Sequence, residues 1–271
     1  MKKKINIADP FFSKEDKKII HDEIDIILDK KLSMGDNVKK FEVEFSKKIE
    51  SKHAIAMNSC TATLEAALTY FNVKDREVII PAQTFIATGM SVHHSGAIPV
   101  YAEINKNDLC LNIENVKSKV NKNTAGVIIV HMAGYMSSDI FELKEYCDNN
   151  NLFLIEDAAH TPGAEINSIK AGNVGHVGCF SFYPTKILTA GEGGMLTTND
   201  DDIARYARSY QNRGVDLNSE VEIFKIPSRN VRLPEFSALL GRIQLKHLDK
   251  FLERRRLIAQ IYQKKLSNLK D

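Results

Sequence analysis

The chain has 271 residues, of which 43% are hydrophobic and 27% are charged, so it can bury a sizeable core as one large domain with appendages. Its formal net charge of +2 is too close to balance to indicate binding to nucleic acid or to an anionic membrane. Residues 1–6 carry positive charge but no apolar stretch follows them, so we expect no signal peptide, no membrane span and a cytoplasmic location.

The first part of the chain predicts two helices and a strand. Residues 14–30 carry an apolar stripe at helical spacing behind a capping residue, Ser13, and therefore predict a helix. A turn is expected at residues 35–37. Four apolar residues then recur at helical spacing between positions 38 and 49 and lead into a short strand at 53–57.

From residue 77 onward, apolar strands alternate with helices. The further predicted strands are 77–81, 98–102, 125–130, 152–156, 178–182 and 194–198. The predicted helices are 87–94, 113–119, 140–149, a helix from 199–200 to about 210, an amphipathic helix at 235–248 and its solvated continuation with the arginines 254–256. This alternation indicates the α/β class, with a mostly parallel seven-stranded sheet between helices.

Cysteines and histidines are scattered along the chain without the close spacing of metal ligands. No cysteine pair has CxxC spacing and no histidines follow HxxxH or HExxH, so we predict neither a metal site nor a disulfide framework. Most of the four cysteines are expected to be buried as small apolar residues. His93 and His94, at the end of a predicted helix, are expected to be packing or surface residues.

Two neighbouring strands bring reactive groups to one edge of the predicted sheet. Asp157 follows the strand at 152–156, where ligands gather in open α/β sheets, and the strand at 178–182 brings Ser181 and then Lys186. A lysine can form a Schiff base with a carbonyl, and pyridoxal phosphate needs that lysine together with an acid facing its ring nitrogen. Taken alone, an aspartate at the end of a strand is more often a helix N-cap or a loop residue, and a lysine is more often a solvated side chain. The joint pattern, which includes the glycines of 191–194, favours a cofactor site.

Residues 58–68 predict a strand-to-helix turn rich in hydroxyl and small side chains. The first N–H groups of a helix are free, and they bind phosphate because the helix dipole points the same way. An ordinary serine or threonine cap is the alternative interpretation.

The order and spacing of several segments resemble the DegT/DnrJ/EryC1/StrS family of sugar aminotransferases, whose fold is that of aspartate aminotransferase, fold type I. The segments that carry the resemblance are Gly35, 41–42, 58–62, 81–88, 96–100, 156–160, 180–186 and 230–236. The resemblance covers almost the whole chain. It implies a helical segment at 1–50 that packs on the large domain and lines the active-site entrance, and a pyridoxal-phosphate-binding large domain at 51–240. Residues 241–271 would form a helix leading to a C-terminal small domain that this sequence lacks.

The resemblance also implies a role for each candidate residue. Lys186 would bind the cofactor and move a proton during transamination, Asp157 would face the ring nitrogen, and His160 would lie near the phenolic oxygen. The other implied cofactor contacts are Cys60 and Thr61 in the phosphate-binding turn, Phe85 and Ala159 on the two faces of the ring, Ser181 at the phosphate, and Asn230 at the phosphate of the partner subunit. Cys60 replaces the family's usual glycine.

Two of these segments leave alternatives open. Phe85 is either a ring-stacking residue or an ordinary core phenylalanine, and Arg232 is either a phosphate or substrate contact or a partner in a surface salt bridge. The family's usual Gly-Tyr before Asn230 is replaced by Ser228 and Arg229, so this loop departs from the family pattern.

The resemblance implies a pyridoxal-phosphate-dependent aminotransferase that moves an amino group from L-glutamate to a nucleotide-linked keto sugar, for surface polysaccharide or amino-sugar biosynthesis. It also implies a homodimer with shared active sites. Some relatives that have histidine in place of Lys186 are dehydratases, so the lysine favours transamination over a dehydratase relative. A catalytically silent regulatory or binding protein stays open as an alternative. Because the sequence ends at Asp271, a truncated product, an active short form and a separately supplied small domain also stay open.

Overall fold

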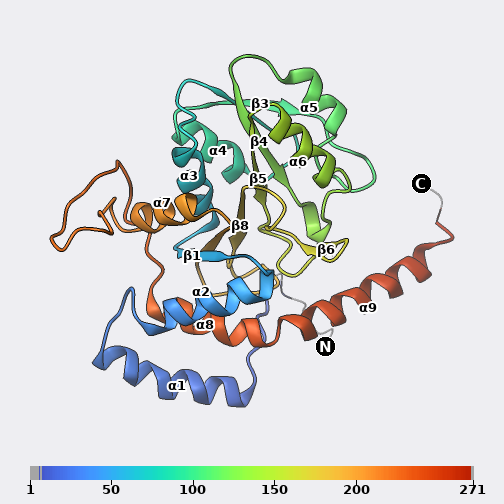
Figure 1. Ribbon diagram of the computed structural model, residues 1–271. Coiled ribbons are helices and arrows are strands. Elements are labelled where there is room, and N and C mark those ends of the chain that lie inside the picture. Colours follow the sequence, from blue (N-terminus) through green and yellow to red (C-terminus); the bar gives the residue numbers. More distant parts are fainter. Residues whose placement is uncertain (1–5, 7, 270–271) are drawn as a thin grey trace.

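The computed structural model describes residue 6 and residues 8–269, and it forms three layers with a sheet between helices (Figure 1). The sheet has seven strands in the order β1-β9-β8-β5-β4-β2-β3. Its strands are β1 His53–Met57, β2 Glu77–Pro81, β3 Ile98–Ala102, β4 Thr124–Val130, β5 Phe153–Asp157, β8 Val177–Ser181 and β9 Gly194–Thr198. Neighbouring strands from β3 to β8 are parallel, whereas β9 is antiparallel to both β8 and β1. The predicted mostly parallel sheet is therefore confirmed, and each strand lies within one residue of its predicted bounds.

A short hairpin outside this sheet was missed by the sequence analysis. Strands β6 Glu165–Ile166 and β7 Ile169–Lys170 pair antiparallel across Asn167 and Ser168. Both turn residues have positive φ, 52° and 62°, where hairpins of this kind usually carry asparagine followed by glycine. The serine in the second position removes the sequence pattern that identifies such a turn.

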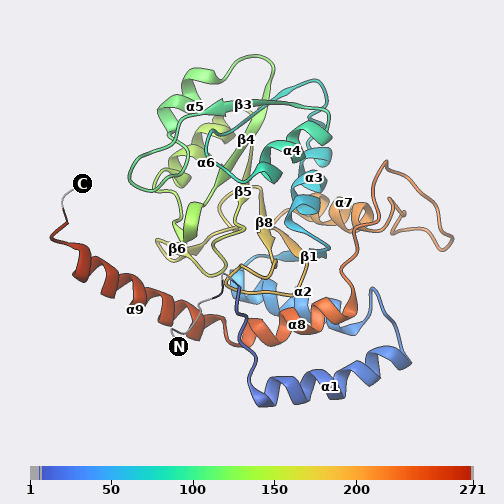
Figure 2. The same ribbon diagram turned by 180° about the vertical axis from the view of Figure 1, so that it is seen from behind.

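The helices cover both faces of the sheet (Figures 1 and 2). They are α1 Lys14–Asp29, α2 Asp36–Ile49, α3 Cys60–Tyr70, α4 Ile86–His94, α5 Ile113–Lys119, α6 Ile140–Asn149, α7 Asp201–Gln211, α8 Glu235–Lys246 and α9 Leu248–Leu266, with a 3-10 turn at Met132–Gly134. Helices α3, α4 and α7 pack on one face of the sheet. The opposite face is covered by α5 and α6 at one end and by α2 and α8 at the other.

Alternation along the central strands determines which layer each side chain enters. In β5, Ile155 packs among the residues of the α3 face, whereas Leu154 packs among those of the α5 and α6 face. Successive side chains of a strand point to opposite faces. The last two residues of β5, Glu156 and Asp157, therefore belong to different layers of the molecule.

The turn predicted at 35–37 is wrong for Asp36 and Asn37, because α2 begins at Asp36 with Gly35 as its N-cap. The buried carboxylate of Glu235, at the start of α8, accepts hydrogen bonds from the N–H groups of Gly35, Asn37 and Val38 at 2.8, 2.8 and 3.1 Å. A Cβ atom at Gly35 would lie 2.8 Å from the Glu235 carboxyl carbon, so only glycine leaves room for this contact. A cap supplied from the far end of the chain cannot be read from local sequence.

Helix α2 forms part of the core and is tied to α8. The rings of Phe41 and Phe45 lie 5.1 and 5.0 Å from those of Phe182 and Phe180. All four rings are fully buried, so residues before position 50 complete one layer of the sheet. The division into 1–50, 51–240 and 241–271 stays a proposal. Residues 1–5, 7, 270 and 271, which include most of the basic start of the chain, lie outside the described residues.

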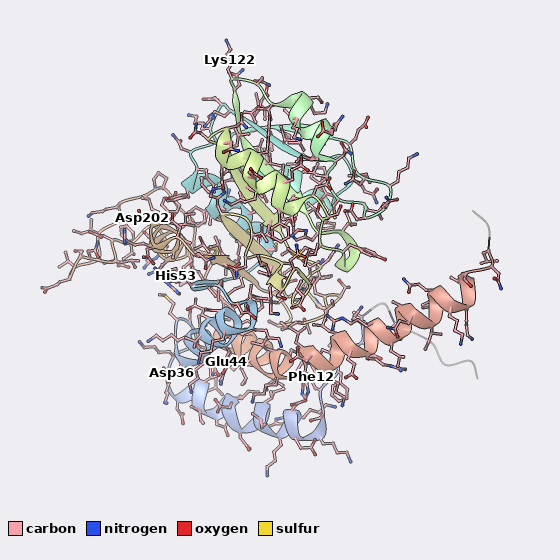
Figure 3. The ribbon with its side chains drawn as sticks, turned by 45° about the vertical axis from the view of Figure 1, so that its right-hand side comes forward. Phe12, Asp36, Glu44, His53, Lys122 and Asp202 are labelled. Carbon is pink, nitrogen blue, oxygen red and sulfur yellow. The ribbon has the colours of Figure 1, made fainter. Side chains whose placement is uncertain are left out.

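Helices α1, α2 and α8 form one end of the molecule, and the turn before β4 forms the opposite end (Figure 3). Asp36 and Glu44 are labelled at the first end and Lys122 at the second. Arg242 of α8 bonds Glu44 of α2 at 2.9 Å. Helix α9 continues from α8 away from the body of the molecule. Within the described residues, no helix is both long and apolar enough to cross a membrane.

We predict that Glu235→Ala lowers the free energy of unfolding by about 2–3 kcal/mol, since three N–H groups lose a charged acceptor. Urea unfolding followed by circular dichroism measures this change. Glu145→Ala, on the exposed surface of α6, is the matched control and should change stability by about 0.5 kcal/mol or less. Equal stability of the two variants would contradict the capping role of Glu235.

Candidate active site

A cavity of about 590 Å³ opens where β2, β4, β5 and β8 end. Small-molecule sites commonly measure about 300–1,000 Å³. Its lining residues are Ser59, Cys60, Thr61, Leu64, Thr84, Phe85, Ala87, Thr88, Val130, Met132, Asp157, Ala159, His160, Ser181, Tyr183, Thr185, Lys186, Glu192 and Gly193. The structure therefore brings together every candidate site residue from the sequence analysis except Asn230 and Arg232.

Asp157 is held at the end of β5 by two hydrogen bonds. Its side chain is on the α3 face and the residue is only 6% exposed. Thr88 Oγ1 donates to Oδ2 at 2.9 Å, and the Ala159 N–H donates to Oδ1 at 3.2 Å. The hydroxyl groups of Thr84 and Thr88 are 2.8 Å apart, which extends the chain of hydrogen bonds. Because each carboxylate oxygen can accept two hydrogen bonds, Asp157 keeps acceptor capacity for a ligand.

Lys186 lies in the turn that follows β8 and is partly buried. The backbone N–H of Lys186 donates to the backbone carbonyl of Tyr183 at 2.9 Å, and this bond fixes the backbone of the turn. Burial lowers the pKa of the Lys186 amine below its ordinary value, while the negative charge of Asp157 acts in the opposite direction. A larger fraction of the amine is therefore neutral and nucleophilic than at a solvated lysine.

His160, three residues after Asp157, accepts a hydrogen bond through Nδ1 from the Ala133 N–H at 3.3 Å. Burial lowers the pKa of its imidazole, and the positive charge of Lys186 lowers it further, whereas Asp157 opposes both effects. The imidazole is therefore neutral over a wider pH range than an exposed histidine.

The start of α3 presents free N–H donors to the cavity. Ser59 caps the helix, because its Oγ accepts from the Ala62 N–H at 3.1 Å. Within residues 6 and 8–269, no group accepts from the N–H of Cys60 or Thr61, the first two helical residues. Ser181, which also lines the cavity, adds a hydroxyl group. The two interpretations of this turn, a helix cap and an anion site, are thus compatible, since they use different N–H groups.

This turn is packed tightly against β9. A Cβ atom at Gly194 would lie 2.4 Å from the Ser59 carbonyl and 2.5 Å from the Cys60 nitrogen, so only glycine permits the approach. The Cys60 thiol has a raised pKa because it is buried and because Asp157 is near. Cys60 therefore acts as a small neutral side chain, as expected for its substitution of a glycine.

Phe85 and Ala159 both line the cavity, on segments that follow β2 and β5. The alternative that Phe85 is a core residue is wrong, because its side chain is 73% exposed and it precedes the first residue of α4. An aromatic ring with this exposure offers a flat apolar surface to a ligand.

Asn230 and Arg232 lie outside the cavity lining. Asn230 is exposed and its backbone pairs with Asn212, while the Arg232 guanidinium donates to Asn212 Oδ1 at 2.8 Å. The prediction that Asn230 reaches a partner's phosphate therefore stays a prediction. The Arg232 side chain therefore has a partner in its own chain. This partner is the side-chain amide of Asn212, so the contact is a hydrogen bond and not a salt bridge.

Sequence reasoning missed two features beside the site. The first is Thr88, which donates to Asp157 and could have been suspected only as a hydroxyl in the first turn of α4. The second is the fully buried Glu156, which accepts from His131 Nε2 and from the N–H groups of residues 172, 174 and 175. Burial alone would raise the pKa of Glu156, but His131 and the hydrogen bonds from the N–H groups of residues 175 and 172 outweigh it and lower this pKa.

The cysteines are free, and Cys110, Cys147 and Cys179 are buried as expected. In the described part of the chain, no group of three histidine, cysteine or acidic side chains could hold a metal ion.

The residues present fit pyridoxal phosphate. The cavity is lined by an amine, Lys186, and by a buried carboxylate, Asp157, whose charge acts on that amine; these are the two groups that the cofactor's aldehyde and ring nitrogen need. Free helix N–H groups and the Ser181 hydroxyl suit the phosphate, and Phe85 with Ala159 offers apolar contacts for the ring.

Comparison with known proteins gives one family. The model of the DegT/DnrJ/EryC1/StrS aminotransferase family matches residues 13–271. GDP-perosamine synthase of Vibrio cholerae is 36% identical over 238 residues, which are 88% of this chain and 64% of that protein. A dTDP-3-amino-3,4,6-trideoxy-alpha-D-glucose transaminase of Micromonospora megalomicea subsp. nigra is 32% identical over 89% of this chain and 64% of its own length.

Solved structures give the same fold. Helicobacter pylori PseC, an aminotransferase involved in the biosynthesis of pseudoaminic acid, superposes with a TM-score of 0.90 at 26% identity. That comparison covers 98% of this chain and 71% of PseC. The fold type I architecture is confirmed, and the chain spans less than two thirds of the length of the two curated relatives named above.

We predict that Thr88→Val weakens binding of pyridoxal phosphate roughly tenfold, equivalent to about 1.4 kcal/mol. Valine keeps the shape of threonine but cannot donate to Asp157, so the carboxylate loses its fixed orientation. Fluorescence or absorbance titration measures the dissociation constant. Thr88→Ser keeps the hydroxyl and is the control, expected to bind within about twofold of the unchanged chain. Equal affinity of the valine and serine variants would contradict the role of this hydrogen bond.

Proposed function

The chain belongs to the DegT/DnrJ/EryC1/StrS aminotransferase family, whose members use pyridoxal phosphate, and we propose that it transfers an amino group from L-glutamate to a nucleotide-linked keto sugar. Surface polysaccharide or amino-sugar biosynthesis is the process that such a product would serve. The names of the relatives, a GDP-perosamine synthase and a dTDP-amino-sugar transaminase, support a nucleotide sugar as the acceptor.

The observation that carries the proposal is that Lys186 and Asp157 face one cavity. Asp157 ends β5 and Lys186 lies in the turn after β8, yet the charge of Asp157 affects the pKa of the Lys186 amine. An amine and a buried carboxylate in one cavity are the pair that a pyridoxal phosphate enzyme requires.

Each of these residues has a separate role in the proposed reaction. Bound pyridoxal phosphate supplies an electron sink for the charge that develops at the carbon next to the amino nitrogen. Asp157 would hold a proton on the ring nitrogen through its free acceptor sites. Lys186 Nζ would bind the cofactor and, once released from it, would accept and return a proton, which its lowered pKa favours. The free N–H groups of α3 orient the phosphate.

A second cavity of about 590 Å³ supports a place for the sugar substrate. It lies between residues 8–11 and α9 and is also lined by Lys186. Arg254 and Arg255 of α9 line it and are exposed, so they offer positive charge to a diphosphate. Lys186 therefore lines both a cavity suited to the cofactor and a second cavity in which two arginines and Lys186 outnumber one carboxylate, Asp9.

A homodimer with shared sites is part of the proposal. Asn230 is exposed and lies away from the cavity of its own chain, which leaves it free to contact a partner. We also propose a cytoplasmic location for the protein.

We predict that the purified chain, mixed with pyridoxal phosphate, develops the visible absorption band of the bound cofactor, and that L-glutamate bleaches it. Bleaching is expected because the donor leaves its nitrogen on the cofactor. Lys186→Ala should develop no such band, since no other amine faces Asp157 in the cavity lining of the described chain. Absorbance spectra before and after glutamate measure both effects.

Lys122→Ala is the matched control, because Lys122, labelled in Figure 3, is exposed in the turn before β4, whereas the cavity lies where β4 ends. This variant should retain the band and the bleaching. A band that persists in Lys186→Ala would contradict the assignment of the lysine. A band that glutamate fails to bleach would contradict the proposed amino donor and favour a dehydratase relative or a silent binding protein.

We also predict the pH dependence of cofactor capture. The capture rate should rise with pH as the Lys186 amine loses its proton, with an inflection below that of a free lysine, because burial lowers this pKa. In Asp157→Asn the inflection should shift to still lower pH, because a negative charge that raises the pKa is removed. Initial rates of band formation across pH, with free lysine as the reference amine, measure both inflections. An upward shift in Asp157→Asn would overturn this explanation.

A further inference from the structure

The turn that follows β4 contains a backbone conformation that alanine rarely adopts. Ala133 has φ 53° and ψ 20°, in the left-handed region, inside the 3-10 turn Met132–Gly134. Non-glycine residues in this region are uncommon, and they often occur where a site requires a particular backbone geometry. Ala133 is exposed, so no buried contact of its methyl group explains the conformation. Its N–H donates to His160 Nδ1, which is the contact the conformation makes.

A buried pair on the far face of the sheet anchors this turn. His131 Nδ1 accepts from the Ser137 N–H at 3.3 Å, and Nε2 lies 2.8 Å from Glu156 Oε2. A backbone N–H can only donate, so Nδ1 of His131 is unprotonated and Nε2 is the donor to Glu156. The backbone N–H of His131 also donates to the Asp157 carbonyl at 3.1 Å. His131 and Glu156 therefore fix the start and the end of the 131–137 turn against β5.

We propose that the Ala133 N–H, held in its left-handed turn by the buried His131–Glu156 pair, fixes His160 as the Nε2–H tautomer. His160 is then a hydrogen-bond donor toward the cavity. His131, Glu156 and Ala133 are positioning residues, because none of them acts except through His160. The inference rests on the proposed function only for the identity of the acceptor in the cavity.

The charges near His160 agree with this arrangement. The charged side chains that affect it are Lys186 and Asp157, which come from the turn after β8 and the end of β5. Nδ1 faces the Ala133 N–H, so a proton on that atom would meet another donor. Nε2 is thus the ring nitrogen that can carry the single proton of the neutral imidazole.

The test is a ¹⁵N NMR measurement on the chain labelled at histidine, without cofactor, so that its outcome does not depend on transamination. His160→Gln assigns the His160 signals among the eight histidines. Above the His160 pKa, the shifts should report one tautomer, with Nδ1 unprotonated and Nε2 protonated. Equal populations of two tautomers, or a proton on Nδ1, would overturn the proposal.

A matched pair at the exposed position 133 tests the role of the turn. Ala133→Gly suits a positive φ and should keep the single tautomer, whereas Ala133→Val resists this φ and should yield a mixture of tautomers. Identical tautomer populations in the two variants would contradict the role of Ala133. His131→Phe should give the same mixture as Ala133→Val, with circular dichroism confirming that it is folded. If that variant does not fold, the position 133 pair decides alone.

Failure of the proposed function would look different. If the spectra with pyridoxal phosphate and glutamate are negative but the tautomer is fixed, the His160 arrangement stands and the cofactor assignment falls. If the spectra are positive and the tautomer is mixed, the cofactor assignment stands and the positioning role of Ala133 falls.

Discussion

The constraint on which this site depends is the period of two along β5. Because the strand ends in two successive carboxylates, it must place one on each face of the sheet. Asp157 enters the layer of α3 and α4, where Thr88 and a free cavity meet it. Glu156 enters the opposite layer, where three backbone N–H groups and His131 surround it. One carboxylate thus remains accessible to a ligand, while the other organises the loop that follows β4 and the loop that leads into β8.

The division between a binding carboxylate and an organising carboxylate is a consequence of hydrogen-bond supply. A buried ionised group is tolerated only when it is well hydrogen-bonded. Glu156 has four donors and no exposed surface, so it offers little to a ligand. Asp157 has two donors, which fix its orientation but leave lone pairs free. Residues adjacent in sequence and identical in charge therefore have different chemistry, and the number of their donors is the physical difference between them.

The sequence predicted the sheet well because its strands are short apolar runs, and the segments between them have apolar residues at helical spacing. Both patterns can be recognised from neighbouring residues alone. It also predicted eight residues of the cavity, because strand ends and helix starts in an α/β fold converge at one edge. It could not predict the Glu235 cap of α2 or the bond from Thr88 to Asp157, since both join segments far apart in the chain. The left-handed backbone conformation of Ala133 could not be predicted either, because alanine has no preference for positive φ.

Few charged side chains line the cavity, and this explains why the backbone around it is tightly packed. Its charged lining residues in the described chain are Asp157, Lys186 and Glu192, together with a His160 whose lowered pKa favours the neutral form, and no arginine lines it. An anionic group at the α3 end must therefore be held mainly by neutral donors. Such donors act through direction and short distance, so their backbone must be fixed before the ligand arrives. Gly194, which lets β9 lie against the backbone of Ser59 and Cys60, provides that rigidity, since any larger residue would displace the free N–H groups from the cavity.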